Sequence, residues 1–172
     1  RRRHTRYPLV TGVQTCALPI SPPDVADGDH DARATTGRMP FVDRVVEHVP
    51  GERIVIERIL DLDRDRMLED HAFILVKDRK PIESCMPVLP AAGAVEALAE
   101  DTQALLPDLG VIGVEEMRAT RWIDLLDTRS LPLRIEARVE SRDAGTGVVS
   151  VRAEIFVDGE ARAAAVVRMG SA

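Results

Sequence analysis

Apolar and charged residues alternate along much of the C-terminal half of the chain. In "LPLRIEARVES", residues 131–141, Leu133, Ile135, Ala137 and Val139 alternate with Arg134, Glu136, Arg138 and Glu140. Successive side chains of a strand point to opposite faces of a sheet, so this pattern predicts a strand with one buried and one wetter face. Residues 147–157 alternate similarly, and the following Asp158-Gly159 pair predicts a tight hairpin into a last strand, 160–169.

One long apolar helix is predicted to precede these strands. It begins at Pro90, because proline suits the first helical position, and it ends at Leu106, just before another proline. Helical spacing places Val95, Leu98, Thr102 and Leu105 on one buried stripe, with Ala91, Ala94 and Ala99 beside it. Glu96, Glu100 and Gln103 share another face. That face either meets water or carries a functional carboxylate.

The remaining elements complete an antiparallel arrangement. Residues 53–63 are rich in β-branched side chains and predict a strand, and residues 110–126 predict a long one. The valines of residues 42–49 recur at helical spacing and predict a short helix that ends at Pro50-Gly51. The expected fold class is α+β: a curved antiparallel sheet wrapped around one long central helix, which is the hot-dog fold.

The N-terminal residues differ in character from the rest. Residues 1–20 resemble the translated constant arms of a sequencing adapter, and residues 21–38, rich in Pro, Asp, Gly and Thr, predict a disordered linker. The hot-dog domain is therefore expected to span residues 39–170. Without the four arginines of residues 1–20, 19 basic residues stand against 29 acidic residues, a formal net charge of −10. This charge does not favour nucleic acid or an anionic membrane as a partner.

The cysteines and the hydropathy indicate a cytoplasmic protein. The two cysteines, Cys16 and Cys85, give neither metal-ligand spacing nor a disulfide framework, so a reducing compartment is expected. No segment approaches the roughly 20 apolar residues of a membrane-spanning helix. No phosphate-binding glycine motif is present either.

His71 is the first candidate catalytic residue. It lies in "EDHAF", with Asp70 before it and Ala72 and Phe73 after it. A histidine with an acidic neighbour and an apolar flank can act as a general base near neutral pH. Phe73 and Trp122 are expected to belong to the core or to the wall of a substrate tunnel.

Three segments together resemble a known family. "DHAF", "PVLPAAGAVEALAE" and "GVIGVEEMRATRWIDL" occur in the order found in the hot-dog dehydratases of polyketide and polyunsaturated fatty acid synthases, and the resemblance covers residues 39–169. The helix is also similar to that of discrete β-hydroxyacyl carrier-protein dehydratases, where a glutamate follows the first proline by six positions, as Glu96 follows Pro90. Two positions depart from the family pattern: Leu75 and Ala91 stand where glycine is usual.

The resemblance implies dehydration of 3-hydroxyacyl thioesters carried on the phosphopantetheine of acyl carrier protein, in polyketide or fatty acid biosynthesis. His71 would remove the proton alpha to the thioester carbonyl. The acid that protonates the leaving hydroxyl would be Glu96 in a homodimer, or an aspartate of a second hot-dog half. Neither a metal nor an organic cofactor is expected.

The resemblance also places substrate-binding residues at the start of the helix. Pro90 sets that start, the N–H groups of Ala91 and Ala92 would polarise the thioester oxygen, and Phe73 would contact the acyl chain. Two alternatives stay open. One is a hot-dog acyl thioesterase. The other is a non-catalytic half of a double hot-dog synthase domain that lends only His71 to a partner.

Overall fold

The computed structural model describes residues 39–74 and 81–171, which belong to one compact unit. These described residues form six strands: β1 Arg44–Val49, β2 Arg53–Asp61, β3 Gly110–Ala119, β4 Ser130–Arg142, β5 Val149–Val157 and β6 Glu160–Gly170. The helices are α1 Met67–Asp70, the 3-10 helix η2 Ile82–Cys85, and α2 Ala91–Leu105. The predictions for residues 1–20 and 21–38, and the position of Leu75, lie outside the described residues.

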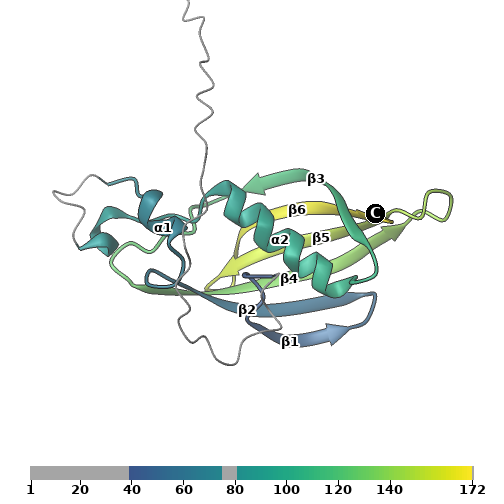
Figure 1. The fold of residues 1–172 in the computed structure, drawn as a ribbon, viewed down its shortest axis with the longest axis horizontal. Coiled ribbons are helices and arrows are strands. Elements are labelled where there is room, and N and C mark those ends of the chain that lie inside the picture. Colours follow the sequence, from purple (N-terminus) through teal and green to yellow (C-terminus); the bar gives the residue numbers. More distant parts are fainter. Residues whose placement is uncertain (1–38, 75–80, 172) are drawn as a thin grey trace, which may run out of the picture. The chain divides into compact units, whose positions relative to one another are not determined.

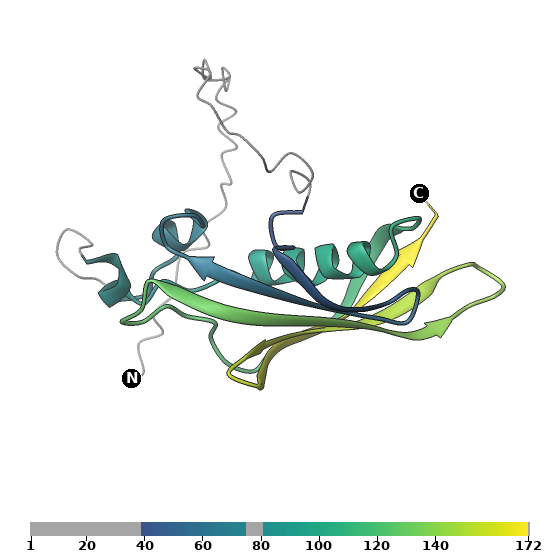
Figure 2. The same cartoon turned by 90° about the horizontal axis from the view of Figure 1, so that it is seen from below.

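All six strands form one antiparallel sheet in the order β1-β2-β4-β5-β6-β3. The helix α2 crosses one face of this sheet and contacts β2 through β6 (Figure 1). The edge-on view shows α2 on one side of the strands only (Figure 2). An antiparallel sheet with one long helix against it is the α+β arrangement that the sequence predicts.

The predicted alternation is what builds the core beneath α2. Every second residue of β5, from Val149 to Val157, is buried, and the residues between them are half-buried. The register places Ile135 of β4 beside Ile155 of β5, so apolar side chains of adjacent strands meet on the same face. The hairpin is also confirmed, because Asp158 (φ 52°) and Gly159 (φ 78°) both adopt the positive φ that a two-residue turn of this kind requires.

Residues 44–49 form the edge strand β1, so the predicted helix at 42–49 is wrong. All six residues of β1 are exposed, and the strand pairs only with β2, with an irregular register between Val45 and Glu47. The valine spacing fitted a helix, but backbone pairing with β2 decides the conformation, and β-branched side chains suit a strand. His48 accordingly lies opposite Ile54 on β2.

The long helix starts one residue later than predicted and is buried on more sides. Pro90 is its N-cap, with extended backbone (ψ 153°), and Ala91 at the first helical position is exposed. Leu98, Thr102 and Leu105 are buried as predicted, whereas Val95 and Ala99 are only half-buried. The buried face comprises Gly93, Ala94, Ala97, Leu98, Glu100, Asp101, Thr102 and Leu105.

Candidate functional site

The backbone around His71 is fixed beside the start of α2. His71 follows α1 directly, and its carbonyl oxygen accepts a hydrogen bond from the N–H of Val88 at 2.9 Å. Ala72 forms a bridge with Pro87, and the N–H of Phe73 donates to the carbonyl oxygen of Met86 at 3.3 Å. The segment that leads into α2 therefore sets the position of His71.

The side chain of His71 is held in one tautomer. Its Nδ1 atom lies 3.1 Å from the carbonyl oxygen of Val88. A carbonyl oxygen can only accept, so Nδ1 carries a proton, and in the neutral imidazole Nε2 then keeps its lone pair. The half-buried ring is thus prepared to take a proton at Nε2.

Exposed aromatic rings flank His71. The Phe73 ring packs against the His71 ring at 5.2 Å with an interplanar angle of 69°, and Trp122 packs against Phe73 at 4.9 Å. Phe73 is 50% exposed and Trp122 is 59% exposed, so of the two predicted places, the core or a tunnel wall, neither ring lies in the core. The structure does bring the predicted pair His71 and Phe73 together.

The first turn of α2 presents backbone N–H groups without a side-chain cap. Pro90 offers no capping side chain, and the first helical hydrogen bond runs from the N–H of Ala94 to the carbonyl oxygen of Pro90, at 3.0 Å. The N–H groups of Ala91 and Ala92 precede this bond, on exposed residues. An uncapped helix N-terminus favours a partial negative charge, such as that of a polarised carbonyl oxygen.

Glu96 lines a groove between α2 and β3 with a volume of about 360 Å³. The lining residues are Met39, Val95, Glu96, Ala99, Glu100, Gln103, Val111 and Val114. Apolar side chains supply most of the walls, and Glu96 itself is exposed. His71 is not among the residues that line this groove.

Glu100 lies in the same groove, and its burial was not predicted. It is only 5% exposed; Oε2 accepts a hydrogen bond from the N–H of Phe41 at 2.6 Å, while the buried Oε1 has no hydrogen-bond partner among the described residues. Burial raises the pKa of Glu100 to about 7, against the lowering effect of the Phe41 hydrogen bond. Phe41 is 59 residues away in sequence, so helical spacing alone could not reveal this contact.

Asp101 is the second buried carboxyl group that sequence reasoning missed. It is fully buried between α2 and the sheet, and neither carboxyl oxygen has a hydrogen-bond partner within the described part of the chain. Burial raises the pKa of Asp101 to about 8, and the negative charge of Glu136 adds to the shift. At neutral pH this side chain is therefore mostly protonated.

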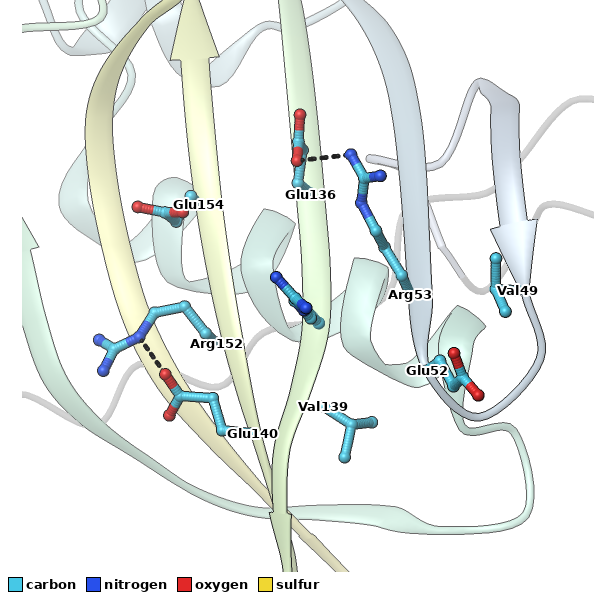
Figure 3. Close-up of a pocket in the computed structure, with 9 residues that line it drawn as sticks. Val49, Glu52, Arg53, Glu136, Val139, Glu140, Arg152 and Glu154 are labelled. Carbon is cyan, nitrogen blue, oxygen red and sulfur yellow. Dashed lines mark hydrogen bonds and ion pairs between the residues drawn. The ribbon is translucent and has the colours of Figure 1, made fainter.

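A larger hollow of about 880 Å³ lies on the opposite face of the sheet. Its lining side chains stand in front of the strands, with α2 behind them (Figure 3). Most of them are charged, and two ion pairs link neighbouring strands: Arg53 with Glu136 at 3.0 Å and Arg152 with Glu140 at 2.9 Å. Since these walls are charged, the hollow does not suit an acyl chain, and the smaller apolar groove remains the better candidate.

Neither a metal site nor a membrane-spanning helix is found among the described residues. In residues 39–74 and 81–171, no three His, Cys, Asp or Glu side chains gather closely enough to hold a metal ion. Within the same ranges, no helix has the length and hydropathy needed to cross a bilayer.

No family model matches the chain, and no curated protein matches it. Several solved structures resemble it. An uncharacterized protein, PH1136 from Pyrococcus horikoshii, shares 12% identity over 86% of this chain and 95% of its own, with a TM-score of 0.55. A hypothetical thioesterase from Streptococcus pneumoniae, solved with coenzyme A, shares 8% identity over 73% of this chain and 82% of its own, with a TM-score of 0.53.

A third similar structure is smu.793 from Streptococcus mutans, bound to acetyl CoA. It shares 10% identity over 74% of this chain and 86% of its own, with a TM-score of 0.52. The TM-scores establish the similarity of fold, whereas identities this low leave the reaction open. Together with the six-stranded antiparallel sheet and its single long helix, these likenesses show that the chain has the hot-dog fold.

Proposed function

We propose that this protein acts on acyl thioesters, and that its reaction is the dehydration of 3-hydroxyacyl chains carried on the phosphopantetheine of acyl carrier protein. The observation that carries the proposal is the His71 tautomer: Nδ1 is held by the carbonyl oxygen of Val88, which leaves Nε2 free as a base beside the start of α2. The similar hot-dog structures that contain coenzyme A or acetyl CoA support the thioester class.

The proposed reaction needs one base, one acid and a polarised carbonyl group. Nε2 of His71 removes the proton alpha to the thioester carbonyl, whose oxygen is polarised by the N–H groups of Ala91 and Ala92. The carbon–oxygen bond at the 3-position then breaks, and the hydroxyl group leaves as water after it receives a proton from a carboxyl group. The products are a 2-enoyl thioester and water.

The acid would come from a second chain or a second hot-dog half, because His71 does not line the groove that holds Glu96. Among the described residues, β3 pairs only with β6, so its other backbone edge is unpaired there, and it carries exposed apolar side chains, including Ile112 at 54% exposure. In the homodimer that we propose, β3 edges pair and Glu96 of one chain approaches His71 of the other. Ile112→Arg should then shift the protein from dimer to monomer in sizing by light scattering, whereas Ile59→Arg on β2 should not.

The test of the reaction is the hydration of crotonyl-pantetheine and its reverse, followed by loss or gain of the enoyl absorbance. His71→Ala should lower the rate by at least about 100-fold, which is typical for loss of a general base. His48→Ala, on the exposed edge strand β1, is the matched control and should keep the wild-type rate. An unchanged rate in His71→Ala would rule the proposal out.

An acyl thioesterase is the second candidate, favoured by the likeness to the hypothetical thioesterase from Streptococcus pneumoniae. In this reaction a water molecule attacks the thioester carbonyl, and the free thiol is released. A thiol-reactive dye distinguishes the two reactions, because dehydration leaves the thioester intact. Release of thiol from both hydroxyacyl-pantetheine and butyryl-pantetheine would favour hydrolysis.

A further inference from the structure

Two of the few aromatic side chains of this protein are exposed beside His71. Aromatic residues make up only 3% of the chain, yet Phe73 is 50% exposed and Trp122 is 59% exposed. The Phe73 ring lies 5.2 Å from the His71 ring, and the Trp122 ring lies 4.9 Å from the Phe73 ring. Exposed apolar side chains that are contiguous mark binding sites, whereas scattered ones do not. The three rings form one such surface, and it begins at the candidate base.

The backbone next to Trp122 is bonded to the segment that holds His71. The carbonyl oxygen of Ile123 accepts a hydrogen bond from the N–H of Leu89 at 2.8 Å. Val88, whose carbonyl oxygen binds Nδ1 of His71, forms a bridge with the residue that follows Ile123. One segment therefore positions both the base and the Trp122 ring, just before α2 begins.

An acyl chain is the occupant that suits these rings. In the proposed reaction, Nε2 of His71 reaches the carbon atom next to the thioester carbonyl, so the rest of the acyl chain leaves from that point. The exposed surface of Phe73 and Trp122 is largely hydrocarbon, and an alkyl chain that covers it removes both from water. In the proposed homodimer, the groove that holds Glu96 belongs to the other chain and would cover the opposite side of the same acyl chain.

The spacing of the rings sets the length of acyl chain that reaches Trp122. An extended alkyl chain advances by about 1.3 Å per carbon atom. The 5.2 Å between the His71 and Phe73 rings therefore corresponds to about four carbon atoms, and the 4.9 Å from Phe73 to Trp122 corresponds to about four more. A butyryl chain thus ends beside Phe73, whereas a decanoyl chain is long enough to reach Trp122.

We propose that Trp122 is a specificity-determining residue, whose exposed ring binds the distal part of an acyl chain of about ten carbon atoms. The ligand class is a medium-chain acyl thioester, and Phe73 contacts the part of the chain nearer to the thioester. The proposal rests on the proposed function for the thioester group and for the point at which the chain begins. It gives Trp122 no part in proton transfer.

The emission of Trp122 tests this contact directly, because Trp122 is the only tryptophan of the chain. The ligands are the unreactive amide analogues of butyryl-pantetheine and decanoyl-pantetheine. Saturation with the decanoyl analogue should shift the emission to shorter wavelength, because the alkyl chain displaces water from the ring, and the butyryl analogue should leave it unchanged. An emission that follows dilution of the protein and ignores the decanoyl analogue would assign the rings to an interface between two copies and would overturn the proposal.

Substitution of Trp122 should change the chain-length preference and leave the chemistry intact. Trp122→Ala should lower kcat/KM for 2-decenoyl-pantetheine at least about tenfold, mainly through KM, and should keep kcat/KM for crotonyl-pantetheine within about twofold of wild type. Trp122→Phe should keep part of the preference for the longer chain, because a smaller ring remains. Ile59→Ala, which also removes an exposed apolar side chain but lies on β2, is the control and should behave as wild type.

The same measurements separate this proposal from the proposed function. An equal loss of kcat/KM for both substrates in Trp122→Ala would place the ring at the thioester or the pantetheine and would overturn the proposal. His71→Ala should lower the rate with both substrates while the emission shift with the decanoyl analogue stays. An emission shift that is specific for the decanoyl analogue, in a protein that yields neither enoyl nor thiol product, would remove only the proposed function.

Discussion

The Nδ1 atom of His71 lies 3.1 Å from the carbonyl oxygen of Val88, and the N–H of Val88 in turn donates to the carbonyl oxygen of His71. Val88 is two residues before the N-cap of α2. Backbone and side chain of His71 are thus tied to one residue beside the helix N-terminus. This arrangement fixes the ring orientation through a backbone carbonyl oxygen.

His71→Gln should separate the structural and chemical roles of this histidine. The glutamine amide nitrogen can still donate to the carbonyl oxygen of Val88, but no atom replaces Nε2 as a base. We expect a thermal midpoint within about 3 °C of wild type, because the lost contacts are half-buried, and a thioester turnover at least about 100-fold lower. A fully active His71→Gln would contradict a role for Nε2.

Stability should fall as the pH rises, because Asp101 must stay protonated in the folded protein. Its folded pKa of about 8 is above its ordinary value of 3.8, so the folded chain holds a proton between these values that the unfolded chain releases. The stabilisation is complete below about pH 4 and is lost as the pH approaches 8. Glu100, with a pKa raised to about 7, adds a change of the same sign.

Asp101→Asn should flatten this dependence, because an amide does not ionise. Between pH 5 and pH 9, urea unfolding of the wild type should lose at least about 2 kcal/mol more than unfolding of Asp101→Asn. Asp108→Asn, just past α2 on an exposed residue, is the control and should keep the wild-type slope. Parallel curves for wild type and Asp101→Asn would show that Asp101 is solvated in solution.

The core beneath α2 should be far more sensitive than the outer face of the sheet. Ile135→Ala in β4 removes a fully buried side chain and should cost about 2–5 kcal/mol of unfolding free energy. Ile59→Ala in β2 removes a side chain that is 52% exposed and should cost less than about 1 kcal/mol. Equal losses of unfolding free energy for the two variants, measured with denaturant, would contradict the burial of Ile135 and the exposure of Ile59.

The β5–β6 hairpin should require glycine at its second turn position. Gly159 has a φ of 78°, so Gly159→Ala should destabilise the protein by about 1 kcal/mol even though no atom lies within 4 Å of the added methyl group. Gly113→Ala in β3 also finds open space, but its φ is not positive. Gly113→Ala is therefore the control, and it should leave the thermal midpoint unchanged or raise it slightly.

Local patterns predicted those parts of the protein that depend on neighbours in sequence. The alternation around Ile135 and Val151 predicted the buried faces of β4 and β5, and Asp158-Gly159 predicted the β5–β6 hairpin, because side-chain direction and turn geometry depend on a few neighbouring residues. The apolar spacing and the flanking prolines likewise predicted the helix between Pro90 and Pro107. The tautomer of His71, by contrast, depends on a carbonyl oxygen 17 residues away.

The sequence by itself determined an antiparallel sheet with one long helix, and it brought His71 and Glu96 forward as candidates. Only the tertiary structure decided that residues 44–49 pair as a strand with β2. It likewise decided that Glu100 and Asp101 are buried, and that His71 does not line the groove that holds Glu96. The physical reason is the same in each case: burial and backbone pairing arise from segments far apart in sequence, which residue periodicity cannot report.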